Sequence, residues 1–252
     1  PFKSEEKRLA VAERLRKFSY VAVRDNLSYT NALEMGCDPN KLIEGRDMAF
    51  LLEPPLTERP RANGKVTVGI SVRKWTFPYA NEDQRGMLFK QYVLSFTVLV
   101  ERLINEVDVN VVFVSTCQGD KSYSYQDNEI AKEILAQLSK KARHRCQLIE
   151  EFQTPESFLE NLKYIDLFIG TRMHACILSL LSGIPTVNVC YEFKSRELFE
   201  AMGLEDYICD IENIDVEHIL PMILKMQSDY SELSKKILLN VSKFRDLNKK
   251  VI

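Results

Sequence analysis

The apolar positions of this chain follow two periods. Short runs rich in valine and isoleucine, which favour buried β-strands, alternate with longer stretches whose apolar residues recur every three or four positions, as in helices. The pattern predicts strands at 66–72, 109–115, 146–150, 165–169, 185–190 and 207–211, and helices at 84–105, 127–140, 155–162 and 173–182. Apolar strands alternating with helices are typical of a parallel, doubly wound sheet. We therefore expect a Rossmann-like domain at 65–214.

The first part of the chain shows the same alternation on a smaller scale. It predicts a helix at 5–17, a buried strand at 19–23 and a second helix at 26–35, capped by Asp25 and ended by Gly36. These elements indicate a separate α/β unit.

A stretch rich in proline, arginine and glycine separates the two parts. We place a linker at 57–64, which leaves residues 1–56 as the first unit. At the other end, residues 215–252 carry an apolar stripe at helical spacing. We expect this helical segment to pack back across both domains.

Composition narrows the class of protein. The 252 residues are 45% hydrophobic and 28% charged, with a formal net charge of -2, which argues against broad nucleic-acid binding. The longest apolar run, 175–191, is cut by Gly183 and Pro185 before it reaches the length of a membrane helix, and no signal peptide precedes it. The six cysteines form no CxxC pair, so we expect reduced thiols in a cytoplasmic protein.

Candidate chemistry lies where the predicted strands end, because ligands of open parallel sheets bind beyond the carboxyl ends of the strands. Polar segments follow five of the predicted strands: 24–25, 73–75, 116–120, 171–174 and 192–196.

The segment Gly170-Thr171-Arg172-Met173-His174 is the strongest candidate. It joins an apolar strand to the start of an apolar helix, where free N–H groups and the helix dipole favour anions. Gly170 lets a ligand approach the backbone, and Arg172 adds a planar fork that matches phosphate or carboxylate. We predict an anion site with the imidazole of His174 at its edge. The alternative is an ion-paired hinge in which His174 bonds a backbone carbonyl.

Several other residues could complete this site. Lys194 could add a second positive charge or simply be solvated, and Arg24 could reach the cleft or pair locally with Asp25. The loop that carries Arg73, Trp75 and Tyr79 suits a sugar-binding rim, although aromatic rings also anchor loops.

The basic cluster 140–145 suits a solvated helix end, with a role at the inner face of a membrane as the alternative. Three distant histidines and scattered carboxylates give no metal-ligand spacing, so we predict no metal. The chain also lacks GxSxG, P-loop and GxGxxG motifs, which removes simple hydrolase, NTPase and dehydrogenase interpretations.

These motifs resemble the polysaccharide pyruvyl transferases. The resemblance rests on 170–174, on Gly183-Ile184-Pro185 and on Tyr191-Glu192-Phe193-Lys194, with weaker support from 23–28 and 47–50. It implies a GT-B-like fold in which residues 1–56 are the closing part of an N-terminal Rossmann-like domain, with its earlier part outside this sequence.

The resemblance also implies a reaction. The pyruvyl group of phosphoenolpyruvate moves onto two hydroxyls of a sugar or lipid-linked oligosaccharide, without a cofactor. His174 and Arg172 are then catalytic, while Arg24, Lys194, Gly170, Thr171 and Met173 bind the donor and Arg73, Trp75 and Tyr79 the acceptor.

Two alternatives remain open. One is a GT-B glycosyltransferase that uses a nucleotide sugar, since Glu192 and Glu200 have a spacing found in many retaining enzymes of that class. The other is a non-catalytic carbohydrate-binding or assembly subunit.

Overall fold

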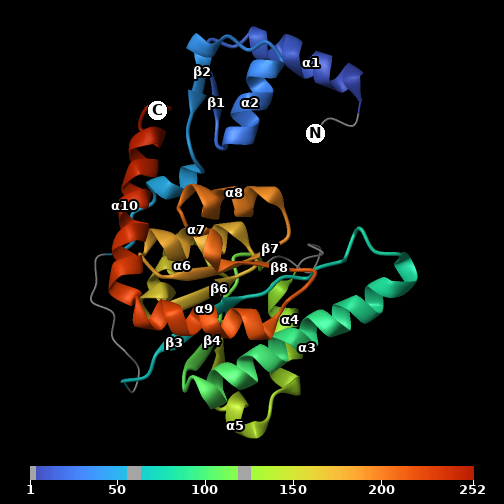
Figure 1. The fold of residues 1–252 in the computed structure, drawn as a ribbon, viewed down its shortest axis with the longest axis vertical. Helices are drawn as coiled ribbons and strands as arrows, with labels where there is room; N and C mark the ends of the chain where they lie inside the picture. Colours follow the sequence, from blue (N-terminus) through green and yellow to red (C-terminus); the bar gives the residue numbers. More distant parts are fainter. Residues whose placement is uncertain (1–3, 56–63, 119–125) are drawn as a thin grey trace. The chain divides into compact units, whose positions relative to one another are not determined.

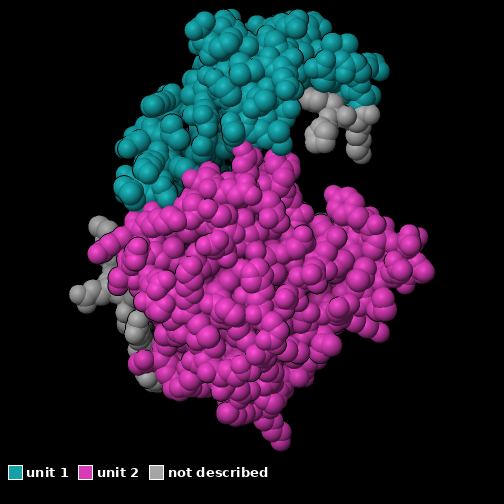
Figure 2. Space-filling model, in the orientation of Figure 1, with its two compact units in different colours: residues 1–53, 239–252 teal, residues 54–238 magenta. Residues whose placement is uncertain are grey.

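The computed structural model describes residues 4–55, 64–118 and 126–252. They form two compact units, shown in different colours in Figure 2. Unit 1 comprises Pro1–Glu53 and Leu239–Ile252, and unit 2 comprises Pro54–Leu238. The predicted linker at 57–64 lies almost wholly outside the described residues.

Unit 2 is built around a six-stranded sheet in which all neighbouring strands are parallel (Figure 1). The strands stand in the order β5-β4-β3-β6-β7-β8. Their bounds are β3 Thr67–Ser71, β4 Asn110–Phe113, β5 Cys146–Leu148, β6 Leu167–Gly170, β7 Thr186–Cys190 and β8 Ile208–Asp210. Every residue of β3, β6 and β7 is buried, as expected for central strands with helices on both faces.

Helices cover both faces of this sheet (Figure 1). The long helix α3 packs against α4, α5 and α9, whereas α7 packs against α6 and strands β6 and β7. Their bounds are α3 Glu82–Glu106, α4 Asp127–Gln137, α5 Lys140–Arg143, α6 Pro155–Asn161, α7 Met173–Leu181, α8 Phe193–Ala201, α9 Val216–Ser228 and α10 Tyr230–Asn248. This confirms the predicted parallel α/β fold.

Helix α7 is the most deeply buried of these helices. Its residues from Ala175 to Leu181 are all buried, because they are apolar on every side. Within it, Ser179 Oγ lies 2.7 Å from Thr186 Oγ1 on β7, which ties the helix to the sheet. Gly183 then ends the helix with a positive φ of 67°, the left-handed cap that the sequence predicts. The turn before α7 is therefore held rigidly.

Unit 1 is smaller. It contains α1 (Glu5–Arg16), β1 (Val21–Val23), α2 (Asn26–Glu34), β2 (Leu42–Glu44) and the 3₁₀ helix η2 (Met48–Leu51). Strands β1 and β2 pair in parallel, and their core contains Ala32, Cys37 and Leu42. Asp25 caps α2 by accepting a 2.7 Å hydrogen bond from Ser28 N, as predicted.

The end of α10 completes unit 1. Arg245 donates to the carbonyls of Phe50 at 2.9 Å and Leu52 at 2.5 Å, and Phe50 meets Phe244 edge to face at 5.2 Å. Asn248 accepts from Arg46 N at 2.6 Å. Backbone groups of the N-terminal segment are thus satisfied by side chains from the C-terminal one.

The sequence pattern misses some local features. It does not predict the short strand β2 or the helix α8, because each has few apolar residues for its period to show. It also extends α4 to residue 140, although Leu138 is extended and Ser139 caps the separate helix α5 through Ala142 N. The helical tail breaks at Asp229.

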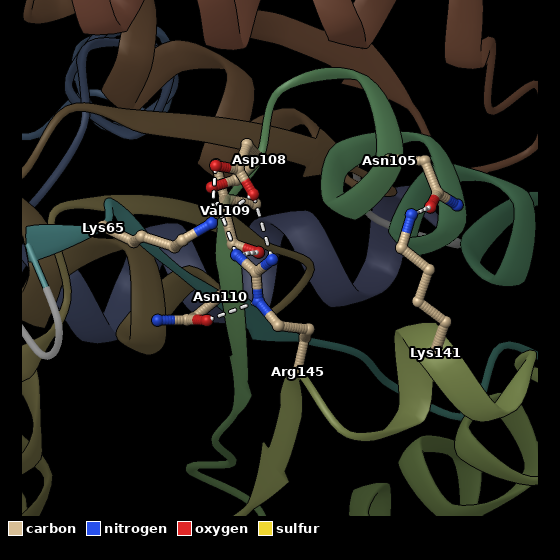
Figure 3. A network of polar contacts seen from close by, with 7 residues as sticks. All are labelled: Lys65, Asn105, Asp108, Val109, Asn110, Lys141 and Arg145. Carbon is tan, nitrogen blue, oxygen red and sulfur yellow. Dashed lines mark hydrogen bonds and ion pairs between the residues drawn. The ribbon is translucent and has the colours of Figure 1, made fainter.

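A polar network closes the amino edge of the sheet in unit 2 (Figure 3). Asp108 binds Lys65 at 2.5 Å and Arg145 at 3.0 Å, and Arg145 also reaches the carbonyl of Val109 at 2.7 Å. Lys141 bonds the side chain of Asn105 at 2.8 Å. Two cations of the basic cluster 140–145, Lys141 and Arg145, therefore bond to other elements of unit 2. Among the described residues, no helix is long and apolar enough to cross a membrane.

Candidate active site

The candidate site lies between β3 and β6, where the order in which the chain adds strands to the sheet reverses. From β3 the chain moves outward to β4 and β5, and from β6 it moves the other way to β7 and β8. The connections that follow β3 and β6 therefore run in opposite directions, and ligands of such folds bind between them, beyond the carboxyl ends of the strands. In register, Ser71 pairs with Gly170 and Gly170 with Asn188, which places these three residues in one row at that edge.

The turn after β6 joins this row to the start of α7. Thr171 N donates to Ser71 O at 2.9 Å, and Arg172 is the N-cap residue of α7. The side chain of Arg172 makes no capping hydrogen bond to the start of α7. The start of α7 is where the sequence predicts an anion, because the first N–H groups and the dipole of a helix favour one.

Gly170 has a packing role that the sequence does not reveal. A Cβ at this position would overlap the sulfur of Cys176 on α7 and lie 3.0 Å from Phe168 Cε1. The absent side chain thus lets the helix pack closely on the strand, a role known for glycines of nucleotide-binding turns.

Arg172 is held by a buried carboxylate. Its Nε and Nη2 atoms each donate a 2.8 Å hydrogen bond to the carboxylate of Asp127. Asp127 is the first residue of α4, and its side chain is 1% exposed. Burial lowers the pKa of Arg172, but the hydrogen bonds and charge of Asp127 outweigh this and raise the pKa above its ordinary value. The guanidinium is a permanent, oriented cation.

A second guanidinium, that of Arg73, follows β3, the strand next to β6. It stacks on the ring of Tyr191 at 3.8 Å and lies 5.3 Å from the ring of Trp75. Both arginines oppose the rise in the pKa of Tyr191 and of Cys117 that burial causes. No ion pair joins Arg73 to a carboxylate of the described residues.

Tyr92 on α3 fixes the backbone of Arg73. Its hydroxyl donates to Arg73 O at 3.0 Å and lies 3.3 Å from Arg73 N, from which it accepts. Burial raises the pKa of Tyr92, so the hydroxyl keeps its proton and remains a donor.

Buried polar atoms gather at this edge of the sheet. Of six buried side-chain atoms that have no hydrogen-bond partner among the described residues, one is Arg46 Nε in unit 1, and the other five belong to unit 2: Ser71 Oγ, Arg73 Nε, Trp75 Nε1, Thr171 Oγ1 and Asn188 Nδ2. Ser71 ends β3, Arg73 and Trp75 follow β3, Thr171 follows β6, and Asn188 lies within β7. Because buried polar groups are normally paired, their concentration here indicates a polar ligand.

The remaining predicted residues lie as follows. His174 is exposed and Met173 half-buried in the first turn of α7, and Lys194 is half-buried in the first turn of α8. Trp75 is buried against Phe77 and Tyr191, so it anchors its loop, whereas Tyr79 is 86% exposed.

Arg24 belongs to unit 1 and pairs with Asp47 at 2.7 Å. The alternative of a local pair with Asp25 is wrong, because Asp25 caps α2. Of the polar segment predicted after β4, Gly119 and Asp120 lie outside the described residues.

Sequence reasoning misses Asp127, Ser71, Asn188 and Tyr92. Ser71 and Asn188 stand inside apolar strands, where a single polar residue is itself a signal of a site. The sequence pattern marks Asp127 only as the start of a helix, and nothing in its spacing indicates Arg172 as its partner. Among the described residues, no group of three or more His, Cys, Asp or Glu side chains could hold a metal ion.

Comparison with known families matches residues 1–192 to the model of the polysaccharide pyruvyl transferases. The chain is also similar to the amylovoran biosynthesis protein AmsJ of Erwinia amylovora, with 27% identity over 241 residues. This match covers 92% of the chain and 56% of AmsJ, so the chain spans little more than half the length of that relative.

Solved structures with little sequence similarity share the fold. The UDP-GlcNAc 2-epimerase of Neisseria meningitidis aligns with a TM-score of 0.56 and 14% identity, and trehalose-6-phosphate synthase OtsA with 0.60 and 12%. Each alignment covers 100% of this chain and 64% of the other. The chain therefore has a fold of the GT-B class.

Proposed function

Since the chain belongs to the polysaccharide pyruvyl transferase family, we propose that it moves the pyruvyl group of phosphoenolpyruvate onto two hydroxyls of a sugar. The acceptor is an exopolysaccharide or its precursor, free or lipid-linked, and the product is a cyclic pyruvate ketal. The observation that carries the proposal is the pair Arg73 and Arg172 beside the start of α7, among buried polar atoms that have no partner in the described residues.

The charges of this site suit a small donor with two anionic groups. Phosphoenolpyruvate carries a phosphate and a carboxylate, and both bind guanidinium forks and helix N-termini well. Asp127 cancels the charge of Arg172, which leaves the charge of Arg73 and the dipole of α7. Lys194 in the first turn of α8 adds a further cation, and Arg24 is a candidate donor ligand from unit 1 by family resemblance.

The reaction needs a proton donor and a proton acceptor. His174, as general acid, protonates the methylene carbon of the donor, so its central carbon becomes electrophilic. A sugar hydroxyl attacks that carbon and loses its proton to the imidazole. A second hydroxyl then forms the other carbon–oxygen bond while the bond to phosphate oxygen breaks, and its proton leaves with the phosphate. The guanidiniums stabilise the negative charge on that leaving group.

Replacing His174 by Gln separates these roles. His174 is exposed in the first turn of α7, so the change should not disturb packing. We expect donor affinity within about twofold of the wild type and a loss of turnover of roughly 10²-fold or more. Loss of donor binding together with turnover would contradict an acid–base role.

Thermal unfolding with ligands tests the proposal. Phosphoenolpyruvate at about 100 times its dissociation constant should add about 2.7 kcal/mol, which raises the melting temperature by roughly 5–10 °C. In Arg73→Gln, loss of charged hydrogen bonds worth about 1.5–3 kcal/mol should weaken donor binding at least tenfold.

Arg143→Gln is the matched control. It removes the same charge beside the amino end of β5, where Arg143 makes one 3.4 Å bond to Cys146 O. It should bind the donor as the wild type does. A shift with UDP or a UDP-sugar and none with phosphoenolpyruvate would replace the proposal by a nucleotide-sugar glycosyltransferase.

A further inference from the structure

Asp127 is a buried acid that the proposed reaction does not use directly. Its side chain is 1% exposed, and its two oxygens accept the paired 2.8 Å bonds from Arg172, with Ser115 Oγ at 3.3 Å as a third contact. Asp127 is also the first residue of α4, where the positive end of the helix dipole stabilises a carboxylate. A charge this buried needs such pairing.

The bonds from Arg172 fix its guanidinium in two respects. A fork that donates through both Nε and Nη2 to one carboxylate cannot rotate about its last bonds, so its plane is set. The same carboxylate removes the net charge of the pair, so the arginine binds an anion less strongly than a free arginine would. A group that only attracted the donor would gain nothing from this neutralisation.

We propose that Asp127 is a positioning residue, which holds the Arg172 guanidinium in the orientation that pyruvyl transfer requires. The same pairing lowers the affinity of Arg172 for an anion. This inference rests on the proposed function. It separates two roles at one site: Arg73, which has no carboxylate partner among the described residues, supplies attraction, and Arg172 supplies alignment.

The test is Asp127→Asn, which keeps the shape of the side chain and removes its charge. Inorganic phosphate, measured by calorimetry, should bind several-fold more tightly, because Arg172 is no longer neutralised. Ketal-bound pyruvate, formed from phosphoenolpyruvate with the glycan-lipid fraction of the source cells, should appear about 10²-fold more slowly, the penalty of a displaced catalytic group. Asp127→Glu keeps the charge, so it should bind phosphate as the wild type does and turn over at an intermediate rate.

The matched control is Asp108→Asn. Asp108 also pairs with two cations, Lys65 and Arg145, but at the amino edge of the same sheet (Figure 3). It should lower stability without changing phosphate affinity or turnover number. If Asp127→Asn instead loses affinity and turnover together, in proportion to unfolded protein, its role is structural and the proposal is wrong. Wild-type turnover in Asp127→Asn would also overturn it.

A second measurement tests the orientation of Arg172 independently of the reaction. The Arg172 Nε–H signal in nitrogen-15 NMR should be sharp and slow to exchange in the wild type, and it should broaden in Asp127→Asn. An unchanged signal overturns the proposal even if no ketal is formed. Absence of ketal from the wild type overturns the proposed function alone.

Discussion

Replacement of Gly170 by Ala should show how tightly the turn before α7 is packed. The new Cβ would overlap the sulfur of Cys176 and press against Phe168 at 3.0 Å. Both neighbours are fully buried, so neither can move into solvent. Overpacking of this kind costs about 1–3 kcal/mol, and the double contact places this site near the upper end. For unit 2 that is a fall in melting temperature of roughly 6–12 °C.

A second substitution should restore most of this loss. Cys176→Ala removes the sulfur, so the methyl group of Ala at position 170 can fill the space it leaves. Cys176→Ala alone should cost about 1–2 kcal/mol through the cavity it creates. The double variant should cost less than the sum of the singles, with a coupling energy of about 2 kcal/mol, measured by urea unfolding of all four proteins.

The control replaces a buried thiol that lies elsewhere. Cys209 on β8 is also buried but lies two strands from Gly170, so Cys209→Ala should add to Gly170→Ala without coupling. If the Cys176 pair is additive as well, Gly170 is not required by helix–strand packing. Its role would then be the one suggested by the sequence, which is to let a ligand approach the backbone.

Two further predictions concern other parts of the chain. Phe50→Ala removes a fully buried ring that packs on Phe244, which should cost unit 1 about 3–5 kcal/mol. Hydrogen exchange at 239–248 should accelerate, and unchanged protection there would refute the packing described. Burial raises the pKa of Cys146 to about 12. Its alkylation, followed by peptide mass spectrometry, should therefore keep rising about tenfold per pH unit through pH 10, whereas levelling near pH 9 would show an ordinary thiol.

The sequence predicts the sheet of unit 2 well because its central strands are buried and mostly apolar. A buried strand such as β6 is flanked by polar turns and glycine, so its start and end are visible in the pattern. Capping residues are equally local: Asp25 and Gly183 act within a few positions of themselves. The fold class follows from such local signals. Sequence identity to the GT-B structures, at 12–14%, is too low to indicate the fold by itself.

The sequence pattern predicts only part of the candidate site. The turn at 171–174 can be found because strand, arginine, histidine and helix follow one another. Its partners cannot, since Asp127 meets Arg172 across 45 positions and Arg73 meets Tyr191 only after the strands have been ordered. The sequence offers an ion pair of Arg172 as an alternative to anion binding, but it does not identify Asp127 as the partner.

The division of α10 between the two units bears on how the chain is made. Its first half belongs to unit 2, but the segment from Leu239 onward completes unit 1. During synthesis, residues 4–53 must wait until all of unit 2 has emerged, a delay of roughly 10–40 s at ordinary elongation rates. Over that time the ring of Phe50 lacks its contact with Phe244, and the carbonyls of Phe50 and Leu52 lack the hydrogen bonds that Arg245 donates. A chaperone that protects residues 4–53 of the nascent chain would therefore raise the yield of folded protein more than one that acts on unit 2.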